Sequence, residues 1–413
     1  MEKDIIKGIK KNVFVLGMVS FFTDISSEML YPLIPIFLTT VLAAPMSIVG
    51  IIEGIAESTA SILKVVSGYL SDRSGKRKKY VIYGYGLSTI AKPLLAFAAT
   101  WHFVLTARFL DRFGKGLRSS ARDALIADST EVKYRGKAFG FHQGLDTLGA
   151  VIGPLFALLF WYLLDGNYQL IFLIAFIPAL ISFILLFLFV SEKKAEKKEG
   201  MKFKLSDFSR EFKIFLLITL IFALGNSSNV FLLLRAKNIF EISGGIPSMI
   251  TSVFGPMDVT AIVILTYVAY NITYSLASMP AGTLSDRIGR RNVMVGGFLI
   301  FSLVYLGFAL ANQGYQVWIL FAVYGFYMAM TEGVSKAFVV DMVPPEKKGT
   351  AIGLYYTATG LLALASSIIA GFLWDKIGVS APFLFGSAAA LVAVVMMLAL
   401  LPKHNSVNHD TRF

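Results

Sequence analysis

Long apolar runs follow one another along almost the entire chain, with short charged segments between them. A helix that crosses a bilayer needs about 20 mainly apolar residues, and the pattern predicts twelve such spans. Their expected ranges are 12–40, 46–71, 79–98, 102–126, 137–163, 168–190, 213–237, 258–285, 292–311, 316–341, 349–374 and 380–402. The expected fold class is therefore an all-α membrane protein with twelve transmembrane helices.

Composition supports this interpretation. Of the 413 residues, 56% are hydrophobic and 15% are charged, whereas soluble domains have about 45–50% apolar and about 25% charged residues. A soluble protein of this composition would expose too much apolar surface to water. The chain has no cysteine, which excludes a disulfide framework and thiolate metal ligands.

The net charge of +12 is concentrated in particular loops. Lysine and arginine gather after the even-numbered spans and in the central segment 191–213, and they are nearly absent after the odd-numbered spans. Positively charged loops remain on the cytoplasmic side of a membrane. We therefore expect a multi-pass protein of the cell membrane with both termini in the cytoplasm. The lipid bilayer, and not nucleic acid, is the expected partner of this positive charge.

Two stretches of the sequence occur twice. Gly68–Arg77 returns as Gly282–Arg291 after 214 residues, and Asp128–Gly140 returns as Asp341–Gly353 after 213 residues. Parallel repeats of this kind build transporters from two six-helix bundles. The predicted parts are an N-terminal bundle at 1–190, a cytoplasmic linker at 191–212, a C-terminal bundle at 213–402 and a cytoplasmic tail at 403–413.

The repeated pattern G-x-L-x-D-R-x-G-(R/K)-R resembles the signature loop of the major facilitator superfamily, in both places where that family has it. The resemblance implies two pseudo-symmetric bundles, secondary transport by alternating access and function as a monomer. In the family, the loop aspartate locks the cytoplasmic ends of the two halves. Carried over, Asp72 would meet the eleventh span near Gly349 and a fourth-span arginine such as Arg118. The gate candidates are Gly68, Asp72, Arg73, Arg77, Arg118, Arg122, Asp286, Arg287 and Arg291.

The fourth span is unusual in its charges, which are Arg108, Asp111, Arg112, Lys115, Arg118, Arg122 and Asp123. At about 100° per residue they share an arc of roughly 140°. A charge at the bilayer centre costs about 2.5–3.5 kcal/mol on insertion scales, so this face should line water or meet carboxylates. Arg118 and Arg122 are expected in the gate. For Arg108, Arg112 and Lys115, a substrate or coupling role and structural pairing both stay open.

Carboxylates that could meet these cations lie on neighbouring spans, at Asp24, Glu28, Glu53, Glu57 and Asp146. Proton coupling requires a buried carboxylate that an approaching cation can discharge. We favour Asp24, which is about half-way along the first span, and then Glu57. The alternative is that each acid stays ionised as a salt-bridge partner.

The second half has fewer charges. In the seventh span, Gly225 and Asn229 stand where the first span has acids. Glu332 and Lys336 are further coupling candidates, but they lie four residues apart on the tenth span and could simply neutralise each other.

The fifth span contains Gly149, Gly153 and Pro154, which resemble the family's antiporter motif except for its last two glycines. This favours proton-coupled antiport, with efflux of a small organic solute. The basic face of the fourth span favours a solute that is anionic or zwitterionic. Glycines in this spacing also allow simple close packing. Two alternatives stay open: a proton-coupled symporter that imports an organic anion or metal chelate, and a non-transporting receptor of transporter fold.

The sequence contains no P-loop, no nucleophile–base arrangement and no metal-ligand cluster. We therefore expect neither an enzyme nor a metal site nor a bound cofactor. The expected partner is a small-molecule substrate, with the proton gradient as the driving force.

Overall fold

The computed structural model describes residues 4–6, 9–192, 208–243, 257–344 and 347–402. Most of the predicted linker at 191–212 and all of the predicted tail at 403–413 lie outside these ranges. The chain divides into two units, Met1–Lys202 and Phe203–Phe413, and each unit is described by itself.

The first unit begins with a short antiparallel hairpin of β1 (Asp4–Ile6) and β2 (Ile9–Lys10). Its helices are α1 (Lys11–Leu30), α2 (Leu33–Thr40), α3 (Met46–Ser74), α4 (Arg77–Ala96), α5 (Trp101–Asp128), the 3-10 turn η1 (Val132–Tyr134), α6 (Arg135–Leu163) and α7 (Tyr168–Phe189). Pro32 separates α1 from α2 and Gly75, in the left-handed region, ends α3, because neither residue continues a helix easily.

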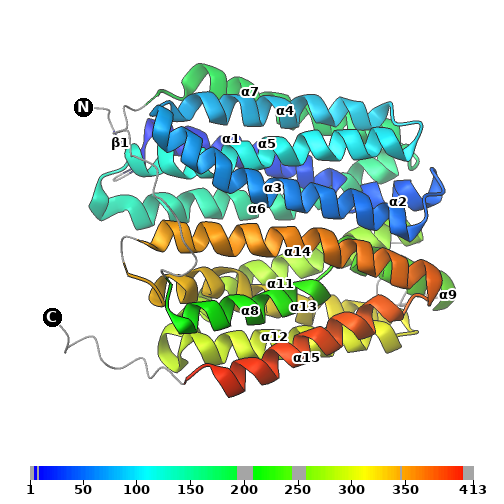
Figure 1. Ribbon diagram of the computed structural model, residues 1–413. Coiled ribbons are helices and arrows are strands. Elements are labelled where there is room, and N and C mark those ends of the chain that lie inside the picture. The colour runs from blue at the N-terminus through cyan, green and yellow to red at the C-terminus, as the bar shows by residue number, and fades with distance from the viewer. Residues whose placement is uncertain (1–3, 7–8, 193–207, 244–256, 345–346, 403–413) are drawn as a thin grey trace. The chain divides into compact units, whose positions relative to one another are not determined.

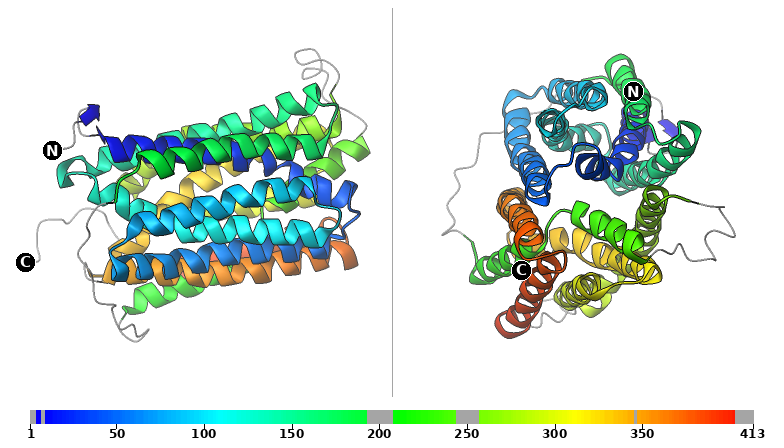
Figure 2. Two further views of the ribbon diagram at one scale, coloured as in Figure 1. Left: turned by 90° about the horizontal axis from the view of Figure 1, so that it is seen from above. Right: turned by 90° about the vertical axis from the view of Figure 1, so that its right-hand side faces the viewer.

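The helices of the second unit are α8 (Arg210–Gly225), α9 (Val230–Ser243), α11 (Val259–Ile288), α12 (Arg290–Leu310), α13 (Gly314–Asp341), α14 (Lys348–Lys376) and α15 (Ala381–Leu400) (Figure 1). The helices α8 and α9 together form one span that is interrupted at residues 226–229. The end-on view in Figure 2 shows the helices of each unit running side by side.

Every predicted span coincides with a helix or a pair of consecutive helices. Within the described ranges, ten helical segments are long and apolar enough to cross a membrane, with α1–α2 and α8–α9 each counted once. The helices α4 and α5 complete the set of twelve: they are 20 and 28 residues long but too charged to meet the same criterion of apolarity. The predicted all-α membrane fold is confirmed.

Both units use one packing plan. In the first unit α5 packs on α3 and α4, and α1 packs on α6 and α7. In the second unit α13 packs on α11 and α12, and α8 packs on α14 and α15. The sequence repeat is therefore also a structural repeat, in which α5 corresponds to α13 and α1 to α8.

Candidate functional site

A pocket of about 480 Å³, open solvent at its mouth included, lies within the first unit between α1, α2, α4 and α5. Its charged lining consists of five cations and three acids: Lys92, Arg108, Arg112, Lys115, Arg118, Asp24, Glu28 and Asp111. Of the charged face predicted on the fourth span, the part from Arg108 to Arg118 lines this pocket, whereas Arg122 and Asp123 are not among its lining residues.

Two glycines allow α3 and α4 to pack directly onto the backbone of α5, whose charged residues line the pocket. A Cβ atom on Gly84 of α4 would lie only 2.6 Å from the carbonyl oxygen of Gly114 in α5. A Cβ atom on Gly116 would lie 2.8 Å from the carbonyl oxygen of Ala60 in α3. Since no side chain fits at these crossings, the longer side chains on either side of them meet across the helix contacts.

Arg108 is fully engaged by Glu53 of α3. Its Nη2 lies 2.6 Å from Glu53 Oε2 and its Nε donates to Oε1 at 3.0 Å. The two side chains are only 5% and 1% exposed. In a forked, buried pair of this kind, each partner neutralises the charge of the other. The pairing favours a structural role for Arg108 over substrate binding.

Lys92 of α4 is a pocket residue that the sequence reasoning missed. Its Nζ lies 3.0 Å from Asp111 Oδ1 and donates to Ser27 Oγ at 3.0 Å, and the residue is 2% exposed. The sequence feature that could have identified Lys92 is its position as a single lysine, followed by Pro93, inside an otherwise apolar run. An ionisable residue in that position is costly unless it is paired.

Arg112 and Lys115 are less engaged. Arg112 Nη2 lies 3.5 Å from Glu57 Oε1, and its buried Nε has no hydrogen-bond partner among the described residues. Lys115 is exposed, and its side chain makes no hydrogen bond or ion pair with any residue that the structure describes. Arg112 and Lys115 therefore both line the pocket, and each has a donor group with no partner among the described residues.

The two arginines assigned to the gate have different surroundings from those expected. Arg118 donates to Ser88 Oγ and lies over the ring of Tyr85, with 4.4 Å from its Cζ to the ring centroid. Arg122 pairs with Asp123 at 3.0 Å. The expected contact between Asp72 and Arg118 is wrong: the fixed α4–α5 crossing directs Arg118 toward α4, away from the end of α3.

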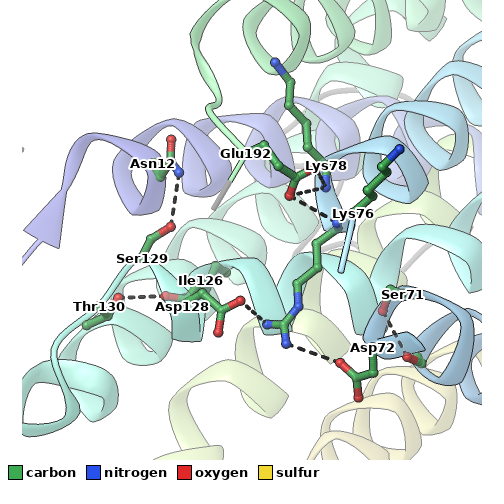
Figure 3. Close-up of polar contacts among 12 residues, drawn as sticks. Asn12, Ser71, Asp72, Lys76, Lys78, Ile126, Asp128, Ser129, Thr130 and Glu192 are labelled. Atoms are coloured by element: carbon green, nitrogen blue, oxygen red, sulfur yellow. Dashed lines mark hydrogen bonds and ion pairs between the residues drawn. The ribbon is translucent and has the colours of Figure 1, made fainter. Parts of the chain in front are cut away.

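Asp72 instead belongs to a cluster at the end of the first unit (Figure 3). Arg77, the first residue of α4, pairs with Asp72 at 3.2 Å and also with Asp128 at the end of α5. The backbone N–H groups of Arg77 and Lys78 donate to Glu192 Oε1 at 3.1 and 3.2 Å. Gly68 lets α3 approach α5, since its Cβ would lie 3.2 Å from Ser120 Cβ.

The second signature loop builds a similar bridge with a different arginine. Arg290, the first residue of α12, lies 3.8 Å from Asp286 and 2.7 Å from Asp341. The predicted gate residue Arg291 is buried and donates to the carbonyl oxygens of Met397 and Leu398 in α15. The remaining gate candidates, Arg73 and Arg287, are exposed, and Gly282 has open space around it.

The antiporter-like motif of α6 packs against the acidic stretch of α1. A Cβ atom on Gly149 would lie 3.0 Å from Asp24 Cβ, and one on Gly153 would lie 2.8 Å from Glu28 Cβ. Pro154 lies inside α6, directly after this contact. The motif therefore has a packing function at two of the predicted coupling residues.

The corresponding region of the second unit is mainly aromatic and has few charged groups. At the interruption between α8 and α9, Asn229 accepts a hydrogen bond from the Tyr324 hydroxyl at 2.7 Å, and Asn226 donates to the Tyr327 hydroxyl at 3.3 Å. Glu332 accepts a hydrogen bond from Tyr274 at 2.8 Å. Lys336 lies over the ring of Tyr356, with its Nζ 5.7 Å from the ring centroid.

Comparison with known proteins identifies the family. The family model of the Major Facilitator Superfamily matches residues 16–269 and 239–412. An MFS-type transporter of Methanocaldococcus jannaschii is 38% identical over 392 residues, which is 94% of this chain and 95% of the relative. The chain therefore belongs to the major facilitator superfamily, whose members are membrane transporters and not enzymes.

Two further similarities are informative. The cis,cis-muconate transport protein of Acinetobacter baylyi is 25% identical over 349 residues, covering 80% of each chain. A crystal structure of the nucleoside transporter NupG matches with a TM-score of 0.78 at 14% identity, covering 94% of this chain and 99% of that one. The second similarity concerns the fold alone.

Proposed function

We propose that this protein transports a small organic anion across the cell membrane in a proton-coupled reaction, and that Arg112 and Lys115 bind the anionic group. The observation that carries the proposal is the unused donor capacity of these two residues in the pocket. A carboxylate accepts several charge-assisted hydrogen bonds. Similarity to a cis,cis-muconate transport protein supports the proposal, because muconate is a dicarboxylate.

The position of Lys115 favours symport. The charge of Lys115 acts on Asp24 and Glu57, and an anion bound to Lys115 would cancel part of that charge. Negative charge added next to a carboxylate favours binding of a proton there. Proton and anion then promote each other's binding, as linkage requires, and such a pair is carried in the same direction.

Antiport, with efflux of the anion, is the second candidate. It is favoured by the resemblance of Gly149, Gly153 and Pro154 to the family's antiporter motif. The contacts of both glycines with α1 give them a packing role that is independent of direction. A receptor without transport is disfavoured by the two signature loops, each of which forms an arginine bridge between two aspartates.

We further propose that the protein is a monomer with both termini in the cytoplasm, and that the proton gradient drives it without a cofactor. The distribution of positive loops in the sequence supports this orientation.

Binding is tested by thermal unfolding of the purified protein with added cis,cis-muconate, since a ligand of the native state raises the unfolding midpoint. Lys115→Gln should weaken the apparent affinity at least about tenfold, because a hydrogen bond to a charged group contributes about 1.5–3 kcal/mol. Lys133→Gln is the matched control, since Lys133 is 68% exposed and pairs with Glu131 outside the pocket. Equal affinity of the two variants would contradict the assigned site.

Direction is tested in proteoliposomes with labelled muconate. Symport predicts accumulation inside when the outer solution is more acidic, and antiport predicts accumulation when the interior is more acidic. Both signs are independent of how the protein is inserted. Transport that does not respond to either gradient would contradict proton coupling.

A further inference from the structure

Two carboxyl groups from different helices meet beside the pocket. Asp24 of α1 and Asp146 of α6 are close neighbours: Asp146 accepts a hydrogen bond from Ser20, which lies one helical turn before Asp24 on α1, and Gly149, one turn after Asp146 on α6, packs against the Cβ atom of Asp24. An ionised carboxylate can only accept hydrogen bonds, and two ionised carboxylates at this separation repel strongly. The contact is therefore favourable only if the two groups hold one proton between them.

The helix packing holds this contact in place. Gly149 follows Asp146 by three residues and so lies on the same face of α6. A Cβ atom at Gly149 would lie 2.7 Å from the carbonyl oxygen of Phe21 and 3.0 Å from Asp24 Cβ. Because nothing larger than hydrogen fits there, α6 approaches the backbone of α1 closely beside the two carboxyl groups.

The neighbours of the two groups differ. Asp146 Oδ1 accepts a hydrogen bond from Ser20 Oγ at 2.7 Å and lies 3.9 Å from Arg122 Nη1, which itself donates to Ser20. These contacts favour an ionised Asp146. Within the part of the chain that the structure describes, neither Ser20 nor Arg122 donates to Asp24, so the shared hydrogen is placed on Asp24 and points to Asp146.

The other charged groups around the pair are few. Lys115, Arg122 and Asp123 face it from α5, Glu28 from α1, and the buried His142 from α6. The helices α2 and α7, which also pack on α1, contain no acidic, basic or histidine residue. Lys115 is the cation that acts on Asp24 from the pocket side.

We propose that Asp24 and Asp146 form one proton-binding site, shared by α1 and α6, that carries the proton coupled to transport. On loading, one solvent proton forms an O–H bond on Asp24, and this group donates to the Asp146 carboxylate. On unloading, the same O–H bond breaks and the proton returns to solvent. The coupling to substrate rests on the proposed function, because Lys115 is also a proposed anion-binding residue.

The proton site itself is tested without any ligand, by infrared spectroscopy of the purified protein during a pH titration. The carbonyl stretch of a protonated carboxylic acid should be present at neutral pH. Asp24→Asn should abolish this component, and Asp146→Asn should shift its titration midpoint by at least about one pH unit. Glu131→Gln, which alters an exposed carboxylate that pairs with Lys10 and Lys133 and not with the groups around Asp24 and Asp146, is the matched control and should leave the component unchanged. A band that survives in Asp24→Asn, or no such band at all, would overturn the proposal.

A backbone variant tests the pair without removing a carboxyl group. Gly149→Ala should push α6 away from Asp24 and remove the same infrared component. Gly144→Ala lies on the same helix with nothing within 4 Å of its added Cβ, so it should retain the component. Loss in both variants, or in neither, would show that the close approach does not build the site.

Coupling is then tested by measuring proton uptake when cis,cis-muconate binds in weak buffer. The wild type should take up protons, and Asp24→Asn should bind muconate without uptake. If muconate does not bind to the wild type, the proposed function fails, while the infrared result still decides the proton site. If Asp24→Asn takes up as many protons as the wild type, the coupled proton binds elsewhere.

Discussion

In the first unit α5 brings eight charged side chains to its neighbours, whereas the corresponding helix α13 of the second unit brings three. The packing partners of the two helices are the same by position in the repeat. Their contacts are not: the first unit has buried ion pairs such as Arg108–Glu53, and the second has hydroxyl–amide contacts such as Tyr324–Asn229. The repeat has therefore preserved helix packing while the chemistry of the two units has diverged.

This difference in chemistry suggests a different role for each unit. Buried ion pairs are sensitive to the loss of either partner, whereas neutral hydroxyl and amide contacts contribute about 0.5–1.5 kcal/mol each. The proposed substrate and proton sites both lie in the charged unit. The aromatic unit supplies no corresponding carboxylate pair, because Gly225 and Asn229 stand in the places of Asp24 and Glu28.

The largest effect should come from Glu53→Gln. The variant leaves Arg108 buried without its counter-charge, which should lower the free energy of unfolding by about 3–5 kcal/mol. The comparison variant in the second unit is Glu332→Gln, where an exposed carboxylate accepts from Tyr274 and the loss should be about 1 kcal/mol or less. Unfolding in detergent, followed by helix content, measures both.

A double variant, Glu53→Gln with Arg108→Gln, sharpens this test. Removing both charges should recover much of the loss, because the cost arises from the isolated buried cation. If the double variant is as unstable as the sum of the single variants, the pair does not act as a unit.

The next effect concerns the two arginine bridges. Arg77 is 9% exposed and its partners Asp72 and Asp128 are 44% and 25% exposed, so Arg77→Ala should cost about 2–3 kcal/mol. Arg290 and its partners are more exposed, so Arg290→Ala should cost about 1 kcal/mol or less. The same unfolding assay measures both variants.

Lys76→Ala is the control for the position of the bridge. Lys76 corresponds to Arg290 in the sequence repeat but is exposed, so its removal should change nothing. If Lys76→Ala destabilises the protein as much as Arg290→Ala does, the bridging residue occupies the same repeat position in both loops, and the assignment of the first bridge to Arg77 is wrong.

These bridges also show where prediction from the sequence ended. The apolar runs were sufficient to predict all twelve spans, including those that correspond to the charged helices α4 and α5. The bridging arginine of the second loop was missed. Helix α12 begins one residue earlier in the repeat than α4 does, and a shift of one residue turns a helical side chain by about 100°.

Partner choice was likewise beyond the sequence. The helical pattern placed Arg108 and Arg112 on one face of the fourth span, and Glu53 and Glu57 on one face of the second span. The relative height of α3 and α5 decides which pairs form, and glycine crossings such as Gly116 with Ala60 determine it. Such crossings depend on backbone contacts between distant segments, which leave no periodic signal along the chain.

The smallest predicted effect is at Glu192, where the two loops differ again (Figure 3). Its carboxylate accepts from the first N–H groups of α4, whereas no side chain of the described residues caps α12. A negative charge at a helix N-terminus stabilises it by about 0.3–1 kcal/mol. In Glu192→Gln, amide hydrogen exchange in the first turn of α4 should therefore accelerate about two- to fivefold, with no change in α12. Glu131→Gln, which alters another exposed carboxylate near this end of the unit, should leave both helices unchanged. An equal acceleration across all of α4 would contradict a local capping effect. It would indicate that Glu192, which follows α7, stabilises the packing of the whole of α4.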